Sequence, residues 1–219
     1  MRQKTETARY AGSLACYRLP PASGITGALT PPAKCAARQS EEAPDLPACK
    51  LWDYLRIFRE RRFPGPHRQL IELAKSGSWR LSHAAVEALT HIDDPSMRNL
   101  GLELMSTPDR CDLGVTLLTA QSQPGDYKLI EQALRQPMSD HVYHSLGMDV
   151  LRFVKANLTG EAEASLALLY ENGPCSMCRE SCVKHLISLN RFPGWMRDEC
   201  RYDADSGTRE LAAGKTEQG

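Results

Sequence analysis

Residues 94–100 read Asp-Pro-Ser-Met-Arg-Asn-Leu, and this stretch decides the fold. An aspartate side chain accepts hydrogen bonds from the first free N–H groups of a helix, and proline fits the first helical position. Met97, Leu100 and Leu104 then recur at spacings of three and four residues, which places them on one helix face. The stretch therefore predicts an amphipathic helix that begins at Pro95.

The same pattern extends from this stretch in both directions along the chain. Apolar residues at helical spacing are separated by short breaks rich in Pro, Gly, Asn and Asp, and no convincing alternation of apolar and polar residues is present. We expect about ten helices, including one capped by Ser139 and a cysteine-rich one after Pro174. The sequence therefore predicts an all-α fold without a sheet.

The pattern of Asp94 and Arg98 returns near the C-terminus, where residues 205–211 again read Asp, three residues, Arg, one residue and Leu. The aspartate caps a helix, and the arginine one turn later is placed to pair with a carboxylate in a neighbouring layer. Helix pairs of roughly 35–45 residues with this start resemble HEAT and armadillo-type α-solenoids. The closing segments 175–179 and 195–203 also resemble the ends of poorly characterised bacterial HEAT-like proteins.

This resemblance covers about residues 50–213 and implies a right-handed α-solenoid of about four degenerate HEAT-like helix pairs, with the repeat domain at 47–213. Residues 1–46 contain Pro20-Pro21, Pro31-Pro32 and many small residues. They offer too little apolar surface to offset the entropy lost on ordering, so we predict disorder there and in the C-terminal segment 214–219.

Charge and composition restrict the partners. Lys plus Arg and Asp plus Glu both number 27, so we expect no general attraction to nucleic acid or to an acidic membrane. No apolar run approaches the ~20 residues that span a bilayer, and the N-terminus lacks the apolar region of a secretory signal. A reducing cytoplasmic location is therefore expected, in which cysteines are free thiols or metal ligands rather than disulfides.

Four of the eight cysteines lie within 26 residues near the C-terminus, two of them spaced C-x-x-C. Zinc binds about four Cys or His ligands, and such a pair often supplies two of them. The candidate ligands are Cys175, Cys178, Cys182, His185 and Cys200. Two other interpretations remain open: a redox-active thiol pair at a helix N-terminus, and thiols packed in a core. Apart from zinc, no cofactor is expected.

The other histidines, cysteines and tryptophans considered are expected to lie on the surface or to pack in the interior. His141 and His144 are spaced i, i+3 but lack further ligands in a pattern, so both are expected to be exposed. Cys49 and Cys111 are expected to pack in the interior. The three tryptophans at positions 52, 79 and 195 are expected in the core or between repeats.

No nucleophile elbow, phosphate-binding loop, dinucleotide fingerprint or H-E-x-x-H motif occurs, so no catalytic residue is assigned. The leading hypothesis is a non-enzymatic scaffold that binds a protein partner along stacked repeats. A zinc- or thiol-dependent module is the first alternative. The second is a DNA glycosylase for alkylated bases, because one such family uses a HEAT-like solenoid; it requires a basic groove and a carboxylate near aromatic residues.

Overall fold

A computed structural model describes residues 48–214, with side chains from Lys50 onward. Within this range all regular elements are helical, which confirms the predicted all-α class. These residues belong to the larger of two units into which the chain divides, Glu41–Gly219. The segments predicted to be disordered, 1–46 and 214–219, lie outside the described residues except for Gly214, as does the side chain of Cys49.

The described chain forms eleven α-helices in the places where apolar spacing predicts them. They are α1 (Ala48–Arg56), α2 (His67–Ala74), α3 (Trp79–Leu89), α4 (Pro95–Met105), α5 (Cys111–Ala120), α6 (Asp126–Leu134), α7 (Asp140–Ala156), α8 (Ala162–Asn172), α9 (Ser176–Ser188), α10 (Gly194–Cys200) and α11 (Ser206–Ala212). Two short 3-10 helices, η1 (Ile57–Arg59) and η2 (Pro108–Arg110), follow α1 and precede α5.

The predicted capping residues begin their helices as expected. The Asp94 side chain accepts a hydrogen bond from the backbone N–H of Ser96 at 2.8 Å, with Pro95 at the first helical position. Ser139 accepts one from the N–H of Val142 at 3.4 Å. Each cap satisfies a backbone donor that has no partner within its helix, so the start of the helix is encoded locally.

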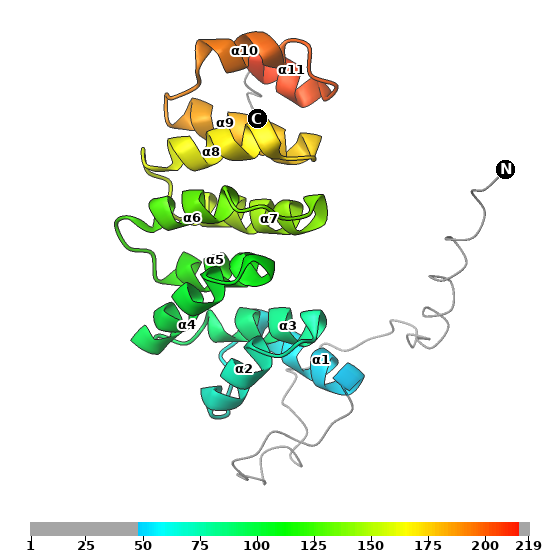
Figure 1. Ribbon diagram of the computed structural model, residues 1–219, viewed down its shortest axis with the longest axis vertical. Helices are drawn as coiled ribbons and strands as arrows, with labels where there is room; N and C mark the ends of the chain where they lie inside the picture. The colour runs from blue at the N-terminus through cyan, green and yellow to red at the C-terminus, as the bar shows by residue number, and fades with distance from the viewer. Residues whose placement is uncertain (1–47, 215–219) are drawn as a thin grey trace, which may run out of the picture. The chain divides into compact units, whose positions relative to one another are not determined.

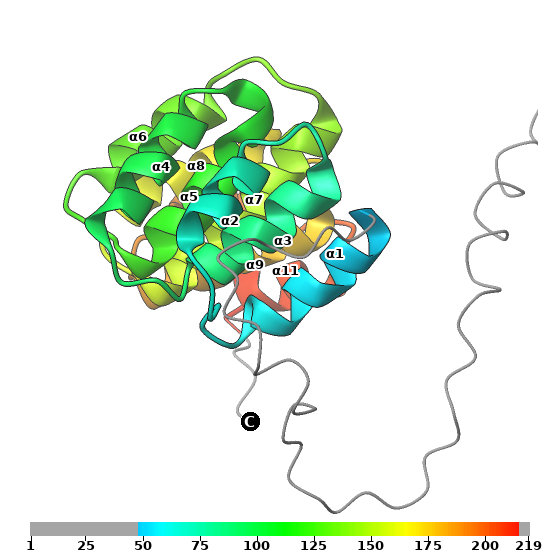
Figure 2. The same ribbon diagram turned by 90° about the horizontal axis from the view of Figure 1, so that it is seen from below.

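The helices lie in successive layers, with α2 beside α3, α4 beside α5, and α8 beside α9 (Figure 1). The odd-numbered helices α3, α5, α7 and α9 each pack on the next in that series, and α6 packs on α8. In the view from below, α4, α6 and α8 overlap on one side while α3, α9 and α11 overlap on the other (Figure 2). One row of helices thus consists of the odd-numbered members.

Helix α5 joins the two apolar clusters of the interior. Its residues 111–118 are all buried, and they read Cys-Asp-Leu-Gly-Val-Thr-Leu-Leu. Leu113 and Leu117 belong to the cluster formed with α1 to α4, whereas Val115 and Leu118 belong to the cluster formed with α6 to α11. A helix that is apolar on all sides is expected to be buried, and here the two faces serve two neighbouring layers.

Two arginines connect helices that are distant in sequence. Arg98 in α4 binds Asp126 at the start of α6, with its two terminal nitrogens 2.9 and 2.6 Å from the carboxylate oxygens. Arg179 in α9 pairs with Asp203 before α11 at 3.2 Å. The predicted pairing across layers is therefore confirmed for Arg98. Arg209 differs, because its guanidinium donates to backbone carbonyls at Asp203 and Ala204.

The tryptophan expectation is wrong for Trp79, which is 63% exposed. Trp195 is 50% exposed, but its ring packs edge-to-face against Tyr170 of α8, with 6.2 Å between the ring centroids. Trp52 is half-buried under the guanidinium of Arg56. Trp79 is the first residue of α3, and its ring contacts His83 one turn later rather than the apolar interior. Trp79 therefore lies outside the face of α3 that the neighbouring helices cover.

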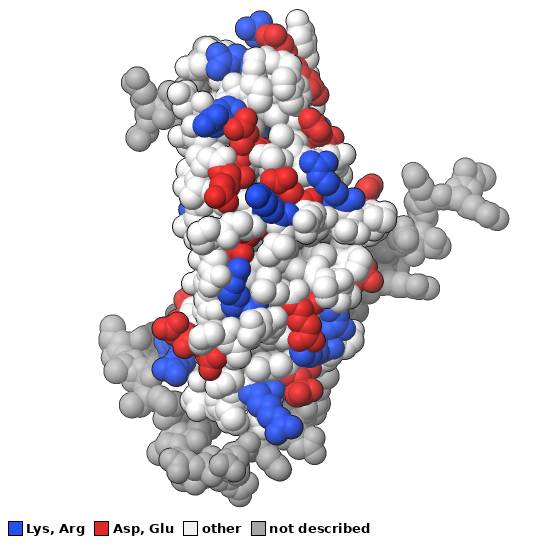
Figure 3. All heavy atoms as spheres, turned by 60° about the vertical axis from the view of Figure 1, so that its left-hand side comes forward, with Lys and Arg blue, Asp and Glu red and all other residues white. Residues whose placement is uncertain are grey.

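Surface charge follows the balanced composition. On the face in Figure 3, acidic and basic side chains are intermixed rather than gathered by sign. Among the described residues, none of the helices has the length and apolar character needed to cross a membrane.

Candidate functional site

The structure brings two of the five predicted metal ligands together with a histidine from another helix. Cys175 is the N-cap residue of α9, Cys178 lies in the first turn of that helix, and His144 projects from α7. The ligand atoms of these three residues all lie within 4.8 Å of one another, and all three side chains are half-buried. The Sγ of Cys178 is 3.7 Å from the Nδ1 of His144.

The other three predicted ligands are not part of this group. Cys182 is fully buried in the core, as its apolar neighbours suggest. Cys200 is also fully buried, and its sulfur lies 3.3 Å from the hydroxyl of Tyr170. His185 is half-buried, and its pKa is lowered by burial and by the charge of Lys155. The five residues therefore do not converge on one point.

The two thiols of the C-x-x-C pair differ in acidity. Hydrogen bonding from the backbone N–H of Cys178 lowers the pKa of Cys175, against a smaller opposing effect of burial, and Arg179 adds favourable charge. Burial and the neighbouring Cys175 together raise the pKa of Cys178 to about 11, with burial as the larger cause. The free N–H groups at a helix start stabilise a thiolate at the N-cap, which explains the asymmetry.

His144 is a candidate ligand that the sequence pattern did not indicate. It was expected to be exposed together with His141, which is exposed in the structure. Both histidines precede Cys175 by more than thirty residues, so no local motif links them to the C-x-x-C pair. The only available signal was the i, i+3 spacing of His141 and His144, which indicates a ligand pair but not its partners.

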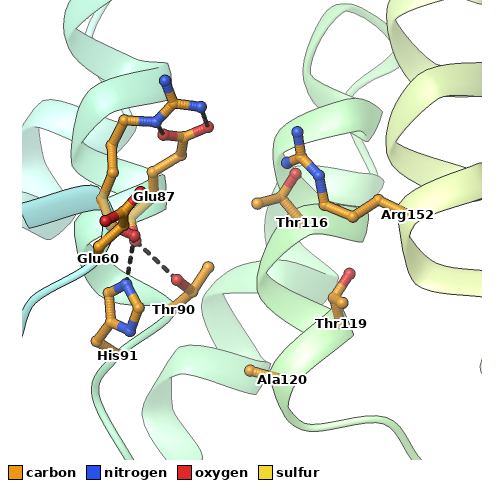
Figure 4. A pocket seen from close by; sticks show the side chains of 9 residues that line it. Glu60, Glu87, Thr90, His91, Thr116, Thr119, Ala120 and Arg152 are labelled. Atoms are coloured by element: carbon orange, nitrogen blue, oxygen red, sulfur yellow. Dashed lines mark hydrogen bonds and ion pairs between the residues drawn. The ribbon is translucent and has the colours of Figure 1, made fainter. Parts of the chain in front are cut away.

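A second site is an open groove of about 610 Å³, which we call the α3–α5 groove. Its lining residues come from η1, α3, α5 and α7 and the turns after η1 and α3; they are Arg59, Glu60, Glu87, Thr90, His91, Thr116, Thr119, Ala120 and Arg152. Figure 4 shows Glu60, Glu87 and His91 on one side and Thr116, Thr119 and Arg152 on the other.

The positive groups of the groove are already engaged by carboxylates. Arg59 forms an ion pair with Glu87, and its backbone carbonyl lies 2.6 Å from the Nε2 of His91. Arg152 lies 3.1 Å from the carboxylate of Asp149, one turn earlier on α7. The groove therefore presents paired charges of both signs rather than a basic surface.

A buried polar network lies on the same row of helices. Asp112 in α5 is 6% exposed, and its Oδ2 lies 3.4 Å from the Nε2 of His83 in α3. The hydroxyl of Ser145 in α7 donates to the same oxygen at 3.0 Å, and the N–H of Leu113 donates to the other at 2.8 Å. Burial raises the pKa of Asp112, but His83 and these two hydrogen bonds outweigh it and the net pKa is lowered. The carboxylate thus links three helices.

Asp149 provides a test of the electrostatics of this row. Its pKa is raised to about 6, mainly by burial and also by Asp112, although Arg152, Thr116 and His83 oppose the rise. An unfolded aspartate has a pKa of about 3.9, so the folded state binds this proton more tightly. Ionised Asp149 therefore lowers stability above pH ~6, and this penalty disappears as the pH falls towards ~4.

We expect Asp149→Asn to raise the unfolding free energy by about 1–3 kcal/mol at pH ~8 and by much less at pH ~4.5.

Urea denaturation of both proteins at the two pH values measures this difference. Asp198→Asn is the matched control, because Asp198 has an arginine three residues later, as Asp149 has, but its side chain is 71% exposed. We expect no pH-dependent gain for the control. An equal gain for Asp149→Asn at both pH values would contradict the raised pKa.

Among the described residues, we take two places as candidate functional sites. One is the group of Cys175, Cys178 and His144, and the other is the α3–α5 groove. Comparison of the chain with models of protein families, with curated proteins and with solved structures found no match.

Proposed function

We propose that the chain is a HEAT-like helical repeat protein that binds a segment of a partner protein in the α3–α5 groove. The layered helices support a right-handed solenoid in which α2–α3, α4–α5, α6–α7 and α8–α9 are four degenerate repeats. In such an architecture one row of helices forms a continuous surface suited to extended partners. The observation that carries the proposal is the open groove of about 610 Å³, which runs over three helices of this row.

The chemistry of the groove favours a partner segment with a lysine or arginine. The hydroxyls of Thr90 and Thr119 donate to carbonyls of their own helices, so that only their oxygens remain to accept. Arg59 and Arg152 are held by carboxylates. Glu60 is exposed at the rim and has no ion pair within the described part of the chain, so it can receive a cationic side chain. Of the two glutamates that line the groove, Glu87 is paired with Arg59, which leaves Glu60 for a cationic group of the partner.

The glycosylase alternative receives less support from this arrangement. A protein that grips the DNA backbone uses arginine and lysine side chains that are free to contact phosphate. In the groove, Arg59 and Arg152 are each paired with a carboxylate, and Glu60 adds negative charge. A non-enzymatic protein-binding role agrees better with these contacts.

A peptide selection tests the proposal directly. Random peptides displayed on phage are selected on the purified protein, and the enriched peptides are measured by fluorescence anisotropy. We expect enrichment of Lys and Arg, and binding that weakens as salt screens the carboxylates. Thr119→Trp fills the groove and is expected to weaken binding about tenfold or more, and Glu60→Gln about two- to fivefold.

Ser188→Trp is the matched control, since it adds the same side chain at an exposed position on α9 away from the groove. It should leave peptide affinity unchanged. Enriched peptides that bind wild type and Thr119→Trp equally well would show that the groove is not the binding surface.

A further inference from the structure

We propose that His144, Cys175 and Cys178 bind one zinc ion, with solvent as the fourth ligand. The three side chains come from two helices, α7 and α9, which pack on each other. This ligand set differs from the one predicted from the sequence, because it contains a histidine from a distant helix and omits Cys182, His185 and Cys200. The inference is independent of partner binding in the α3–α5 groove.

The distances between the sulfur and nitrogen atoms of the three side chains agree with a tetrahedral zinc site. Zinc–sulfur bonds of ~2.3 Å and zinc–nitrogen bonds of ~2.0–2.1 Å at the tetrahedral angle place sulfur and nitrogen about 3.6 Å apart, and two sulfurs about 3.8 Å apart. The Sγ of Cys178 lies 3.7 Å from the Nδ1 of His144, and the Sγ of Cys175 completes a group that spans at most 4.8 Å. The ion would therefore enter with small side-chain adjustments.

The ligand atoms of the three side chains indicate which metal ion the site would prefer. Two sulfurs and one imidazole nitrogen suit zinc, whereas calcium and magnesium require oxygen ligands. Among the described residues, no fourth His, Cys, Asp or Glu joins the group. All three ligands are half-buried, so water reaches the remaining position. A site with three protein ligands and one open position follows from these contacts.

The principal competing interpretation is a redox-active disulfide between Cys175 and Cys178. That chemistry needs only the two thiols and gives His144 no direct role. In the structure the imidazole Nδ1 lies 3.7 Å from the Sγ of Cys178, and the three ligand atoms lie within 4.8 Å of one another. A zinc site requires this proximity and a disulfide does not. His144 therefore distinguishes the two.

Zinc binding to the full-length protein tests the inference. The reduced protein is stripped with a chelator, separated from it and titrated with zinc in competition with a chromophoric chelator, with a phosphine reductant present throughout. We expect about one zinc per chain for wild type. His144→Ala, Cys175→Ser and Cys178→Ser should each weaken zinc binding at least about tenfold, because each removes one ligand.

Two histidine variants serve as matched controls. His141→Ala lies on the same helix one turn earlier, and His185→Ala removes the histidine that the sequence pattern favoured. Both should bind zinc as wild type does. Loss of zinc in His185→Ala with retention in His144→Ala would overturn the proposed ligand set. Circular dichroism of each variant verifies that its helical content is unchanged.

Three further cysteines have side chains that the structure does not describe, so they need a separate control. A variant with Cys16, Cys35 and Cys49 all changed to serine should still bind one zinc. X-ray absorption at the zinc edge should show two sulfurs and two nitrogen or oxygen neighbours. Three or four sulfurs, or loss of zinc in the triple variant, would overturn the site, as would a wild-type protein that binds no zinc under reducing conditions.

Discussion

Replacement of Arg98 by alanine is expected to lower the free energy of unfolding by about 3–5 kcal/mol, because it leaves the Asp126 carboxylate buried without its counter-charge. Asp126 is 1% exposed and accepts two hydrogen bonds from the guanidinium. Arg98 also donates to the carbonyl of Gln121 at 3.0 Å. For a chain of this length, the melting temperature should fall by roughly 10 °C. Chemical denaturation followed by circular dichroism measures the loss.

The ion pair of Lys75 and Glu103 provides the matched control. It also joins consecutive helical layers, at 2.7 Å, but its side chains are 39% and 58% exposed. An exposed pair contributes about 0–1 kcal/mol, so Lys75→Ala should have a small effect. Arg98→Met combined with Asp126→Leu should recover much of the Arg98→Ala loss, because no unpaired charge is then buried. Equal losses in the free energy of unfolding for Arg98→Ala and Lys75→Ala would contradict the argument that burial makes the pair of Arg98 and Asp126 important for stability.

Gly114→Ala is the second substitution with a large expected effect. Helices α4 and α5 cross where Gly114 faces Gly101, and a Cβ atom on Gly114 would lie 2.6 Å from the carbonyl oxygen of Gly101 and 2.8 Å from the backbone nitrogen of Met105. Backbone atoms cannot rotate away, so the helices must separate. Overpacking costs about 1–3 kcal/mol or more, and the better helix propensity of alanine returns up to ~1 kcal/mol. Since two of the close contacts involve backbone atoms, we expect the upper part of this range, a net loss of about 2–3 kcal/mol.

Two other glycines serve as comparisons with smaller expected effects. A Cβ on Gly101 would meet its nearest neighbours at 3.3 Å, so Gly101→Ala should lower the free energy of unfolding by less than Gly114→Ala does. Gly194, at the start of α10, has no such neighbour within 4 Å, and Gly194→Ala should be neutral or slightly stabilising. Denaturant midpoints that do not follow this order would contradict the close approach of α4 and α5.

The helices could be predicted because their signals are local. Asp94 and Ser139 cap the helices that follow them, and the apolar spacing around Leu100 recurs within one helical turn. Such signals depend on atoms a few residues apart, so the sequence contains them in full. The exposure of Trp79 was not predictable in this way, because it depends on which side of α3 the neighbouring helices cover.

The residues of each candidate site are close in space but come from segments that are distant along the chain, so no local sequence pattern could group them all. The sequence alone determined that residues 48–214 form helices without strands, where helices such as α4 and α7 begin, and that a C-x-x-C pair lies at the beginning of α9. Only the tertiary structure decided that His144 joins Cys175 and Cys178, while Cys182 and Cys200 point into the core. The reason is physical: helix periodicity fixes the faces of one helix, but the packing of α7 against α9 decides which faces meet.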